Sequence, residues 1–253
     1  MKKAMVVFVG AGPGDPDLIT VKGRRILRNA DVVIYAGSLV NPALLKGLKA
    51  TVYDSSGMNL DQIIGVMKKA TDAGGLVARL HTGDTSLYSA ISEQIERLSK
   101  LNIKFEVIPG VSSAMAGAAV LCQELTIPEI SQTVILTRLE GRTPVPKDEA
   151  LSELAKHKAS MVIFLSAGMN DNVVKELRTG YSGTTPVVVI EKATWPEQRI
   201  VRGTLDDIAD KVKEAGIKKT ALIYIGESLR ASVESLGMES KLYDKDFKHE
   251  YRR

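Results

Sequence analysis

Three short loops rich in glycine and small polar residues contain the groups of this sequence that are best placed to bind a ligand. They are residues 10–15 (GAGPGD), 81–84 (HTGD) and 109–113 (PGVSS). Glycine lets the backbone approach a ligand closely, and serine and aspartate side chains add hydrogen-bonding groups. The chain has neither a nucleophile elbow nor a recognisable catalytic triad pattern. We therefore expect chemistry that depends on the placement of reactants more than on an activated side chain.

The first loop does not fit the patterns that bind nucleotide phosphates. Asp15 stands where a dinucleotide fingerprint needs its third glycine, and Asp17 adds a second carboxylate that would repel phosphate. No acidic residue follows the next predicted strand to bind a ribose hydroxyl, and no Gly-Lys-Ser/Thr follows the loop. On the residues alone, a tight turn that packs a strand on a helix explains the loop equally well. A nicotinamide-dependent oxidoreductase remains an alternative of another class.

The elements around these loops alternate between strands and helices. In the first half, strands are expected at residues 5–9, 31–35, 52–54, 76–80 and 105–108. Between them lie helical patterns at about 20–29, from Asn59 to the glycines at 74 and 75, and from Leu87 to Leu98. This alternation predicts a mostly parallel sheet, whose ligands bind at the carboxyl ends of the strands. The three loops lie at that edge.

The second half predicts a separate α/β domain with a mixed sheet. Strands are expected at 133–137, 161–165 and 221–225, and a hairpin is expected from 186–190 and 198–202 around KATWPEQ. Helices are expected at about 148–157, 170–178 and 205–215. We divide the chain into an N-terminal α/β domain at 1–125, a C-terminal α/β domain at 131–230 and a charged tail at 231–253. Without docking, the tail would be poorly ordered.

Composition indicates an ordinary globular protein. Of 253 residues, 44% are hydrophobic and 25% charged, with a net charge of +4 and no basic stripe, so no nucleic-acid partner is expected. No segment approaches the ~20 apolar residues that span a bilayer, so no membrane partner is expected. The only cysteine, Cys122, is expected to be a buried thiol, and its isolation favours the cytoplasm. His81, His157 and His249 lie far apart in the sequence, so no metal site is expected, and the last two are expected at the surface.

Taken together, these motifs resemble the tetrapyrrole methyltransferase family. The resemblance rests on VGAGPGDPDLITVKG, HTGD, IPGVSS, YAGSLV, LTRLEGRTPVP, KATWPEQRIV and the terminal SKLYDKDFKHEYRR, and covers nearly the whole chain. It is greatest to the branch that methylates ring carbon 11 of precorrin-4 or its cobalt complex in cobalamin biosynthesis. The resemblance implies two α/β domains with S-adenosylmethionine in the cleft between them, S-adenosylhomocysteine as product, no protein-bound metal, a tetrapyrrole substrate and a homodimer.

The resemblance also implies which residues bind the methyl donor. They are Pro13, Gly83, Asp84, Leu87, Ser112 and Ser113, and from the second domain Ser166, Ala193 and Ala221. A helix-capping role is the alternative for Asp84. The chain departs from the family pattern at Thr85, where proline is usual, which leaves the stiffness of that loop open.

Arginines bind carboxylates in paired hydrogen bonds, and the acetate and propionate arms of the macrocycle carry many carboxylates. We expect substrate contacts from Arg138 and Arg142, with Lys192 and Arg199 behind them; solvated surface charge is the alternative for each.

No catalytic residue is certain. Asp15, which caps the first helix or faces the cleft, and Tyr88 are candidates, while Tyr88, Met58 and Trp195 fit either the cleft wall or the core. Two further alternatives remain: a sister enzyme that methylates another ring carbon, a modified histidine or ribosomal RNA, and a non-catalytic tetrapyrrole carrier.

Overall fold

The structure is a computed structural model that describes residues 4–141, 143–230 and 248. The chain divides into two compact units, Met1–Ala116 with Lys192–Glu197, and Gly117–Glu191 with Gln198–Arg253. This division lies earlier in the chain than the expected boundary near residues 125–131, and it adds most of the KATWPEQ segment to the first unit. Apart from residue 248, the expected tail lies outside the described residues.

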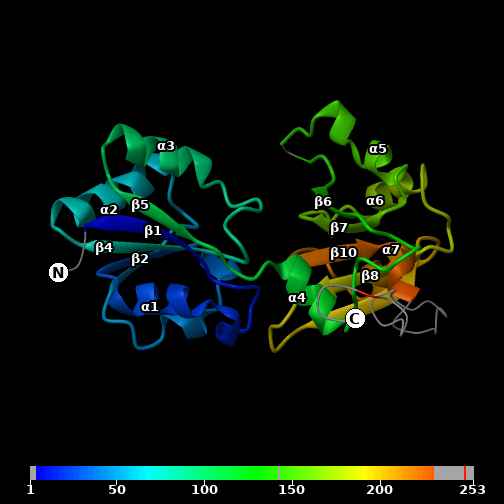
Figure 1. Cartoon of the computed structure of the whole chain (residues 1–253), viewed down its shortest axis with the longest axis horizontal. Coiled ribbons are helices and arrows are strands. Elements are labelled where there is room, and N and C mark those ends of the chain that lie inside the picture. The colour runs from blue at the N-terminus through cyan, green and yellow to red at the C-terminus, as the bar shows by residue number, and fades with distance from the viewer. Residues whose placement is uncertain (1–3, 142, 231–247, 249–253) are drawn as a thin grey trace. The chain divides into compact units, whose positions relative to one another are not determined.

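The first unit is built around a five-stranded sheet in the order β3-β2-β4-β1-β5 (Figure 1). The sequence predicted a mostly parallel sheet, and all of its strand pairs are parallel. The central strands β1 and β4 are almost wholly buried, which explains their continuous apolar sequence. The strands are β1 Met5–Gly10, β2 Val32–Tyr35, β3 Thr51–Asp54, β4 Leu76–His81 and β5 Phe105–Ile108.

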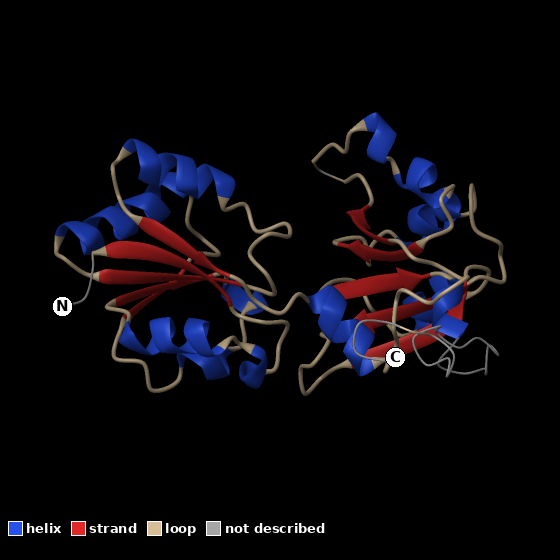
Figure 2. Ribbon diagram, viewed as in Figure 1, coloured by secondary structure: helices blue, strands red, loops and turns tan. Residues whose placement is uncertain are grey.

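Helices cover both faces of this sheet (Figure 2). Along β1, Val7 and Val9 pack with Leu27 of α1 (Val21–Asn29), whereas Val6 and Phe8 pack on the opposite face. That face is covered by α2 (Leu60–Asp72) and α3 (Ser92–Lys100). The alternation follows from the two-residue period of a strand. Short 3-10 turns add Pro16–Leu18, Gly37–Leu39 and Pro42–Leu45.

The sequence correctly located the starts of α1 and α2 but not that of α3. The Thr20 side chain caps α1, and Asn59 forms a reciprocal capping box with Gln62 at α2. Helix α3 begins at Ser92, so the expected helical start at Leu87 is wrong. Tyr88 and Ala90 have φ angles of 53° and 49°, which interrupt a right-handed helix.

The second unit contains a mixed five-stranded sheet in the order β6-β7-β10-β8-β9. Only β6 and β7 are parallel, and β8 and β9 form the expected antiparallel pair. The strands are β6 Val134–Arg138, β7 Ser160–Phe164, β8 Pro186–Glu191, β9 Arg199–Thr204 and β10 Ala221–Ile225. Its helices are α5 Leu151–Ala155, α6 Asn170–Leu177 and α7 Ile208–Glu214, with 3-10 turns at Lys147–Glu149 and Glu227–Arg230. The division between the two units falls within α4, Ser113–Val120.

Side chains from α5, α6 and α7 form one core with alternate residues of the second sheet, including Ile223 and Ile225. Tyr224 lies between Ile223 and Ile225 in the sequence but is not part of this core. A Cβ atom on Gly117 of α4 would lie 2.0 Å from the Tyr224 hydroxyl oxygen. A side chain larger than that of glycine would therefore not fit at this position of α4. The expected helices at 148–157 and 205–215 are shorter than the sequence indicated.

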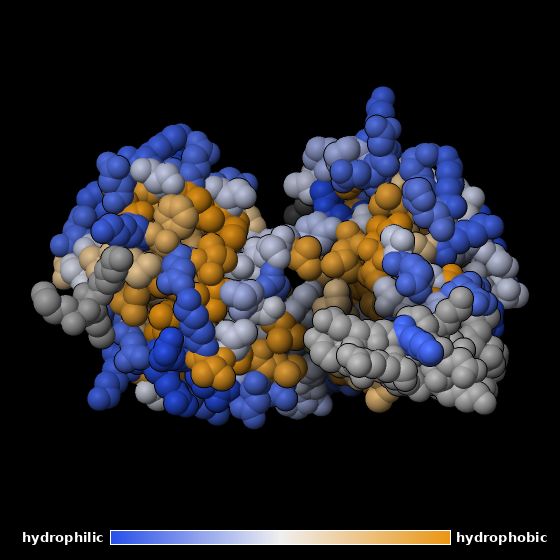
Figure 3. Space-filling view, viewed as in Figure 1, coloured by the Kyte–Doolittle hydropathy of each residue, from blue (hydrophilic) through white to orange (hydrophobic). Residues whose placement is uncertain are grey.

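Two surface features concern Cys122 and the edge strand β5. Cys122 is exposed, so its predicted burial is wrong: it follows α4 with a φ angle of 53°, in a turn outside the core. The edge strand β5 leaves Phe105 and Val107 partly exposed, and apolar side chains are visible over this strand in Figure 3.

Within the described residues, no helix is both long and apolar enough to cross a membrane.

The fold predicts opposite effects for two glycine-to-alanine changes. A Cβ atom on Gly110 would lie 2.2 Å from the carbonyl oxygen of Gly83, whereas a Cβ atom on Gly65 of α2 would have nothing within 4 Å. Gly110→Ala should therefore lower the free energy of unfolding by ~1–3 kcal/mol, because backbone must move. Gly65→Ala should raise it by ~0.5–1 kcal/mol through helix propensity. Urea unfolding of both variants checks this, and equal effects would contradict the described packing.

Candidate functional site

The carboxyl ends of β1, β4 and β5 meet in a backbone-on-backbone contact. A Cβ atom on Gly10 would lie 2.5 Å from the Cα atom of Gly110, and one on Gly110 would lie 2.2 Å from the carbonyl oxygen of Gly83. Gly12 and Gly83 exchange backbone hydrogen bonds of 3.3 and 2.8 Å. Only residues without side chains allow loops to approach this closely. The three sequence motifs are thus brought together, as expected for a ligand-binding edge.

Asp84 clamps two of these loops. Its Oδ2 accepts a hydrogen bond of 2.8 Å from the Gly110 amide, and its Oδ1 accepts from the Ser86 amide at 2.8 Å and from the Ser86 hydroxyl. Burial alone would raise the pKa of Asp84, but the hydrogen bonds from the Ser86 hydroxyl and the two amides lower it below its ordinary value. Because α3 begins only at Ser92, Asp84 does not cap that helix. The Thr85 side chain beside it is buried.

The first glycine loop is held by a segment from far along the chain. The Trp195 indole donates a 2.9 Å hydrogen bond to the Pro13 carbonyl, and the Asp15 amide donates one of 2.9 Å to the Thr194 hydroxyl. A Cβ atom on Gly14 would lie 2.1 Å from the Trp195 ring, so only glycine fits there. Ala193 is buried in the same segment, which belongs to the first unit and not to the second, where the sequence placed it.

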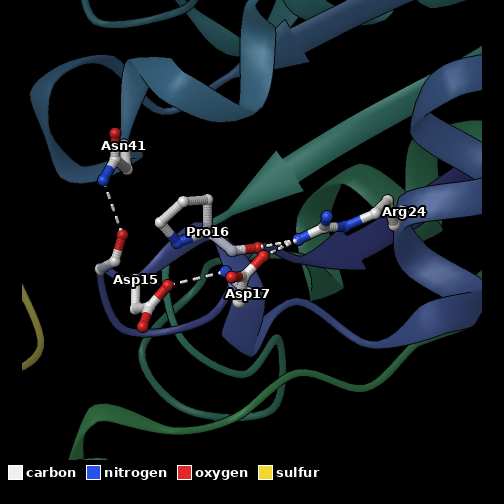
Figure 4. Close-up of polar contacts among 6 residues, drawn as sticks. Asp15, Pro16, Asp17, Arg24 and Asn41 are labelled. Atoms are coloured by element: carbon white, nitrogen blue, oxygen red, sulfur yellow. Dashed lines mark hydrogen bonds and ion pairs between the residues drawn. The ribbon is translucent and has the colours of Figure 1, made fainter.

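Further hydrogen bonds hold the acidic end of this loop, at residues 14–17. The Asp15 carboxylate accepts a 2.8 Å hydrogen bond from the Asp17 amide and caps the 3-10 turn Pro16–Leu18, not α1. The Arg24 guanidinium donates a hydrogen bond to the Pro16 carbonyl and another, of 3.0 Å, to Oδ1 of Asp17. The side-chain amide of Asn41 donates to the Gly14 carbonyl at 2.8 Å (Figure 4). The loop is therefore fixed at both ends, as pre-organised binding requires.

The remaining sequence-predicted residues of the first unit lie around this edge. Ser112 is buried, and its Oγ accepts a 3.2 Å hydrogen bond from the Ala114 amide at the start of α4, where Ser113 is the first residue. Leu87 is half-buried in the turn after Asp84, with its amide 3.5 Å from the Asp84 carbonyl. Tyr88 is 47% exposed.

In the second unit, Ser166 ties together the ends of two parallel strands. Its hydroxyl donates to the Phe164 carbonyl at 2.7 Å and accepts from the Leu139 amide at 3.0 Å, and the residue is fully buried. Ala221 is buried at the start of β10. The sequence analysis missed Leu165, which has a φ angle of 54° and is 70% exposed. Because strained backbone conformations cluster at functional sites, Leu165 is a further candidate for ligand contact.

The three described cations that were expected to bind substrate already have partners within the chain. Arg138 donates to the Thr143 and Pro144 carbonyls at 3.1 and 2.8 Å, so it stabilises its own loop. Arg199 pairs with Glu191 at 2.6 Å and donates to the Ala215 carbonyl at 2.7 Å. Lys192 lies over the Trp195 ring, 5.8 Å from its centroid, and 3.8 Å from Glu197. Arg142 lies outside the described residues.

Sequence reasoning missed a polar cluster inside the first unit. Arg79 and His81 lie on β4 with 5% and 4% exposure, and both line a cavity of about 440 Å³. Burial lowers the pKa of Arg79 to about 10, and burial together with the Arg79 charge lowers the pKa of His81 to about 3. At neutral pH the arginine is charged and the histidine neutral. The signal was present in LVARLH, where both interrupt an apolar strand.

In the described part of the chain, no group of three or more histidine, cysteine, aspartate and glutamate side chains is arranged to hold a metal ion. The residues at the carboxyl edge suit an organic ligand instead. The loops at 10–15, 81–84 and 109–113 contain two carboxylates, no lysine or arginine, and many backbone groups. Such an edge favours a ligand with positive charge over one with phosphates.

The model of the family described as Tetrapyrrole (Corrin/Porphyrin) Methylases matches residues 5–209. A relative from Methanocaldococcus jannaschii, the cobalt-precorrin-4 C(11)-methyltransferase, is 58% identical over 251 residues, which are 98% of this chain and 96% of the relative.

Solved structures give the same result. The chain is similar to the X-ray structure of a cobalamin biosynthetic enzyme, the cobalt precorrin-4 methyltransferase CbiF, with a TM-score of 0.87 and 48% identity over 89% of this chain and 96% of that one. It is also similar to the uroporphyrin-III C-methyl transferase from Thermus thermophilus complexed with S-adenyl homocysteine. There the TM-score is 0.76 and the identity 27%, over 90% of this chain and 99% of that one.

The depressed pKa of His81 predicts a pH-dependent stability. As the pH falls below ~6.5, the His81 imidazole becomes protonated in the unfolded protein. In the folded protein it stays neutral, because its pKa there is about 3. The free energy of unfolding should therefore fall by up to ~1.4 kcal/mol per pH unit from this group between about pH 6 and 4. His81→Gln should flatten this part of the profile in urea unfolding.

The exposed His157 supplies the control. His157→Gln should leave the wild-type slope unchanged. A His81→Gln slope equal to that of the wild type would contradict the neutral, buried state of His81.

Proposed function

The chain belongs to the tetrapyrrole methylase family, and on that basis we propose that it transfers the methyl group of S-adenosylmethionine to carbon 11 of precorrin-4 or cobalt-precorrin-4 in cobalamin biosynthesis. The observation that carries the proposal is the 58% identity to a cobalt-precorrin-4 C(11)-methyltransferase over 98% of the chain. The convergence of the glycine loops supports the proposal, because methyl transfer depends mainly on the alignment of the reactants.

The chemistry of the carboxyl edge supports S-adenosylmethionine as the ligand of the first unit. The ligand supplies a methyl group on a positively charged sulfur, already activated for displacement. Asp15 and Asp84 give this edge negative charge, which favours the sulfonium and ammonium groups and disfavours a pyrophosphate. The glycine contacts leave backbone amides and carbonyls as the polar groups of the loops. This charge pattern also argues against the nicotinamide-dependent alternative.

We assign the donor contacts to the residues that match the family motifs. In the first unit they are Pro13, Gly83, Asp84, Leu87, Ser112, Ser113 and Ala193; in the second they are Ser166 and Ala221. Their common property is that backbone packing or hydrogen bonds hold each of them, so they are suited to orient a ligand. Orientation of the methyl group for in-line displacement and exclusion of water supply much of the acceleration for such a transfer. Asp15 and Tyr88 remain candidates for contact with the acceptor.

The acceptor is an electron-rich tetrapyrrole with carboxylate arms. Arg138, Arg142, Lys192 and Arg199 remain proposed contacts for these arms, although Arg138 and Arg199 would have to share donors that they already use. We also propose that the active form is a homodimer, on the resemblance to the family alone.

Anaerobic turnover with methyl-labelled S-adenosylmethionine tests the proposed function. Metal-free precorrin-4 and cobalt-precorrin-4 are offered in parallel, and the label is located by mass spectrometry and NMR. We expect label on carbon 11, and the preferred compound identifies the natural acceptor. Label on another carbon would instead support a sister enzyme of the same family. Absence of label from both compounds, with donor binding intact, would contradict the acceptor assignment.

Asp84→Ala should weaken donor binding. It removes a carboxylate at the carboxyl edge and releases the Gly110 amide, which Asp84 holds at 2.8 Å. Loss of hydrogen bonds to a charged group corresponds to an increase of about 10- to 100-fold in the donor dissociation constant. Calorimetric titration with S-adenosylmethionine measures this effect.

Asp72→Ala is the matched control, because it removes an exposed carboxylate that pairs with Lys68 on α2. It should bind the donor as the wild type does. Unchanged donor affinity in Asp84→Ala would refute the role given to Asp84.

A further inference from the structure

A cavity of about 440 Å³ in the first unit contains a buried cation that the donor site does not use. Its walls combine apolar side chains of Leu60 and Ile63 on α2 with the polar side chains of Arg79 and His81 on β4, and Tyr88 also lines it. Its volume is within the range of small-molecule sites, about 300–1,000 Å³.

Arg79 has no carboxylate partner among the described residues. Its Nε donates to Oε1 of Gln94 at 3.1 Å, and its Nη1 donates to Oγ of Ser55 at 3.0 Å and, at 3.4 Å, to the Ile34 carbonyl. All three acceptors are neutral. Glu93 also lines the cavity but forms no ion pair with Arg79 in the described part of the chain. Burial of a charge without a counter-ion is costly, so the protein alone leaves this guanidinium incompletely stabilised.

Two polar groups of the cavity still have unused hydrogen-bonding capacity. Nη2 of Arg79 makes no hydrogen bond within the described residues, while its three neutral contacts fix the plane of the guanidinium. Nε2 of His81 is buried without a partner there. A guanidinium with a fixed orientation and a spare donor is suited to a carboxylate, which it binds in charge-assisted hydrogen bonds.

We propose that Arg79 binds a carboxylate arm of the acceptor in this cavity and selects for acceptors with acidic arms. The identity of the acceptor rests on the proposed function. The apolar side chains of Leu39, Leu60 and Ile63 face the non-polar part of the bound group, and the carboxylate replaces the counter-ion that the protein does not provide. Arg79 is thus a specificity-determining residue, and Arg138 and Arg199, whose guanidinium groups already have partners within the second unit, are secondary to it.

Binding of uroporphyrin, a stable fluorescent tetrapyrrole with carboxylate arms, tests this without turnover. Arg79→Met should weaken its binding by about 10- to 100-fold, the loss expected for charge-assisted hydrogen bonds. Arg79→Lys keeps the charge without the planar fork and should give an intermediate loss. Arg25→Met removes an exposed arginine of α1 and is the control for net charge, with binding within about twofold of wild type. Calorimetry should show unchanged affinity for S-adenosylmethionine in all three variants.

Turnover and an amidated probe separate a direct contact from a structural effect. With the proposed acceptor, Arg79→Met should raise KM by the same factor as the dissociation constant, with kcat changed by only a few-fold. The wild type should bind amidated uroporphyrin about 10-fold or more weakly than the free acid, and this comparison does not depend on the folding of any variant.

The outcomes distinguish this inference from the proposed function. The role of Arg79 would be overturned if the wild type bound uroporphyrin and amidated uroporphyrin with equal affinity. It would also be overturned if Arg79→Met left KM and the affinity for uroporphyrin unchanged. Either result would leave the proposed methyl transfer intact. Arg79-dependent binding without methyl transfer to either precorrin-4 compound would support the carboxylate site and refute the proposed function.

Discussion

The close contact of three glycines at the carboxyl edge of the first sheet is the constraint on which the candidate site depends. Gly10, Gly83 and Gly110 pack backbone against backbone, where a single methyl group would overlap main-chain atoms. Asp84 secures this contact by binding the Gly110 amide. Since the loops are held by each other, the polar groups of their backbones are fixed before any ligand arrives, which reduces the ordering cost of binding.

Charge divides the first unit into two regions of different chemistry. The glycine loops contain Asp15 and Asp84 and no lysine or arginine, whereas the neighbouring cavity is lined by the Arg79 cation and the neutral His81. A positively charged methyl donor fits the first region and an acidic acceptor fits the second. Because Arg79 and His81 lie on β4 and Asp84 follows it in the HTGD loop, one strand and its loop contain groups proposed for both reactants. That arrangement is appropriate for a reaction that depends on alignment.

Much of the fold could be predicted from the sequence, because its elements have strong local signals. The parallel sheet followed from apolar runs alternating with helical patterns, and the hairpin of β8 and β9 from two runs around a turn. The predictions failed where the backbone conformation differs from the one that the local residue pattern favours. Leu87 fits a helical period, but positive φ angles at Tyr88 and Ala90 delay the helix. Cys122 is in a generally buried class of residue, yet it lies in an exposed turn.

The site was predictable only in part, for a similar reason. Glycine-rich loops can be recognised in a sequence, and their convergence follows from parallel strands. The partners of Arg138 and Arg199 cannot be recognised in this way, because they are backbone carbonyls and a residue of a neighbouring strand. Nor does the sequence show that Trp195 would hold the Pro13 loop across so long a separation. Arg79 was overlooked because the sequence shows it only as an interruption of an apolar strand, whereas its burial and its neutral partners are visible only in the structure.

We expect the acidic, glycine-lined edge of the first unit to bind S-adenosylmethionine and not a nucleotide pyrophosphate. Parallel calorimetric titrations of the wild type with S-adenosylmethionine, S-adenosylhomocysteine and a nicotinamide dinucleotide measure this preference. The first two should show saturable binding and the third none. Binding of the dinucleotide without binding of either sulfur compound would contradict this expectation.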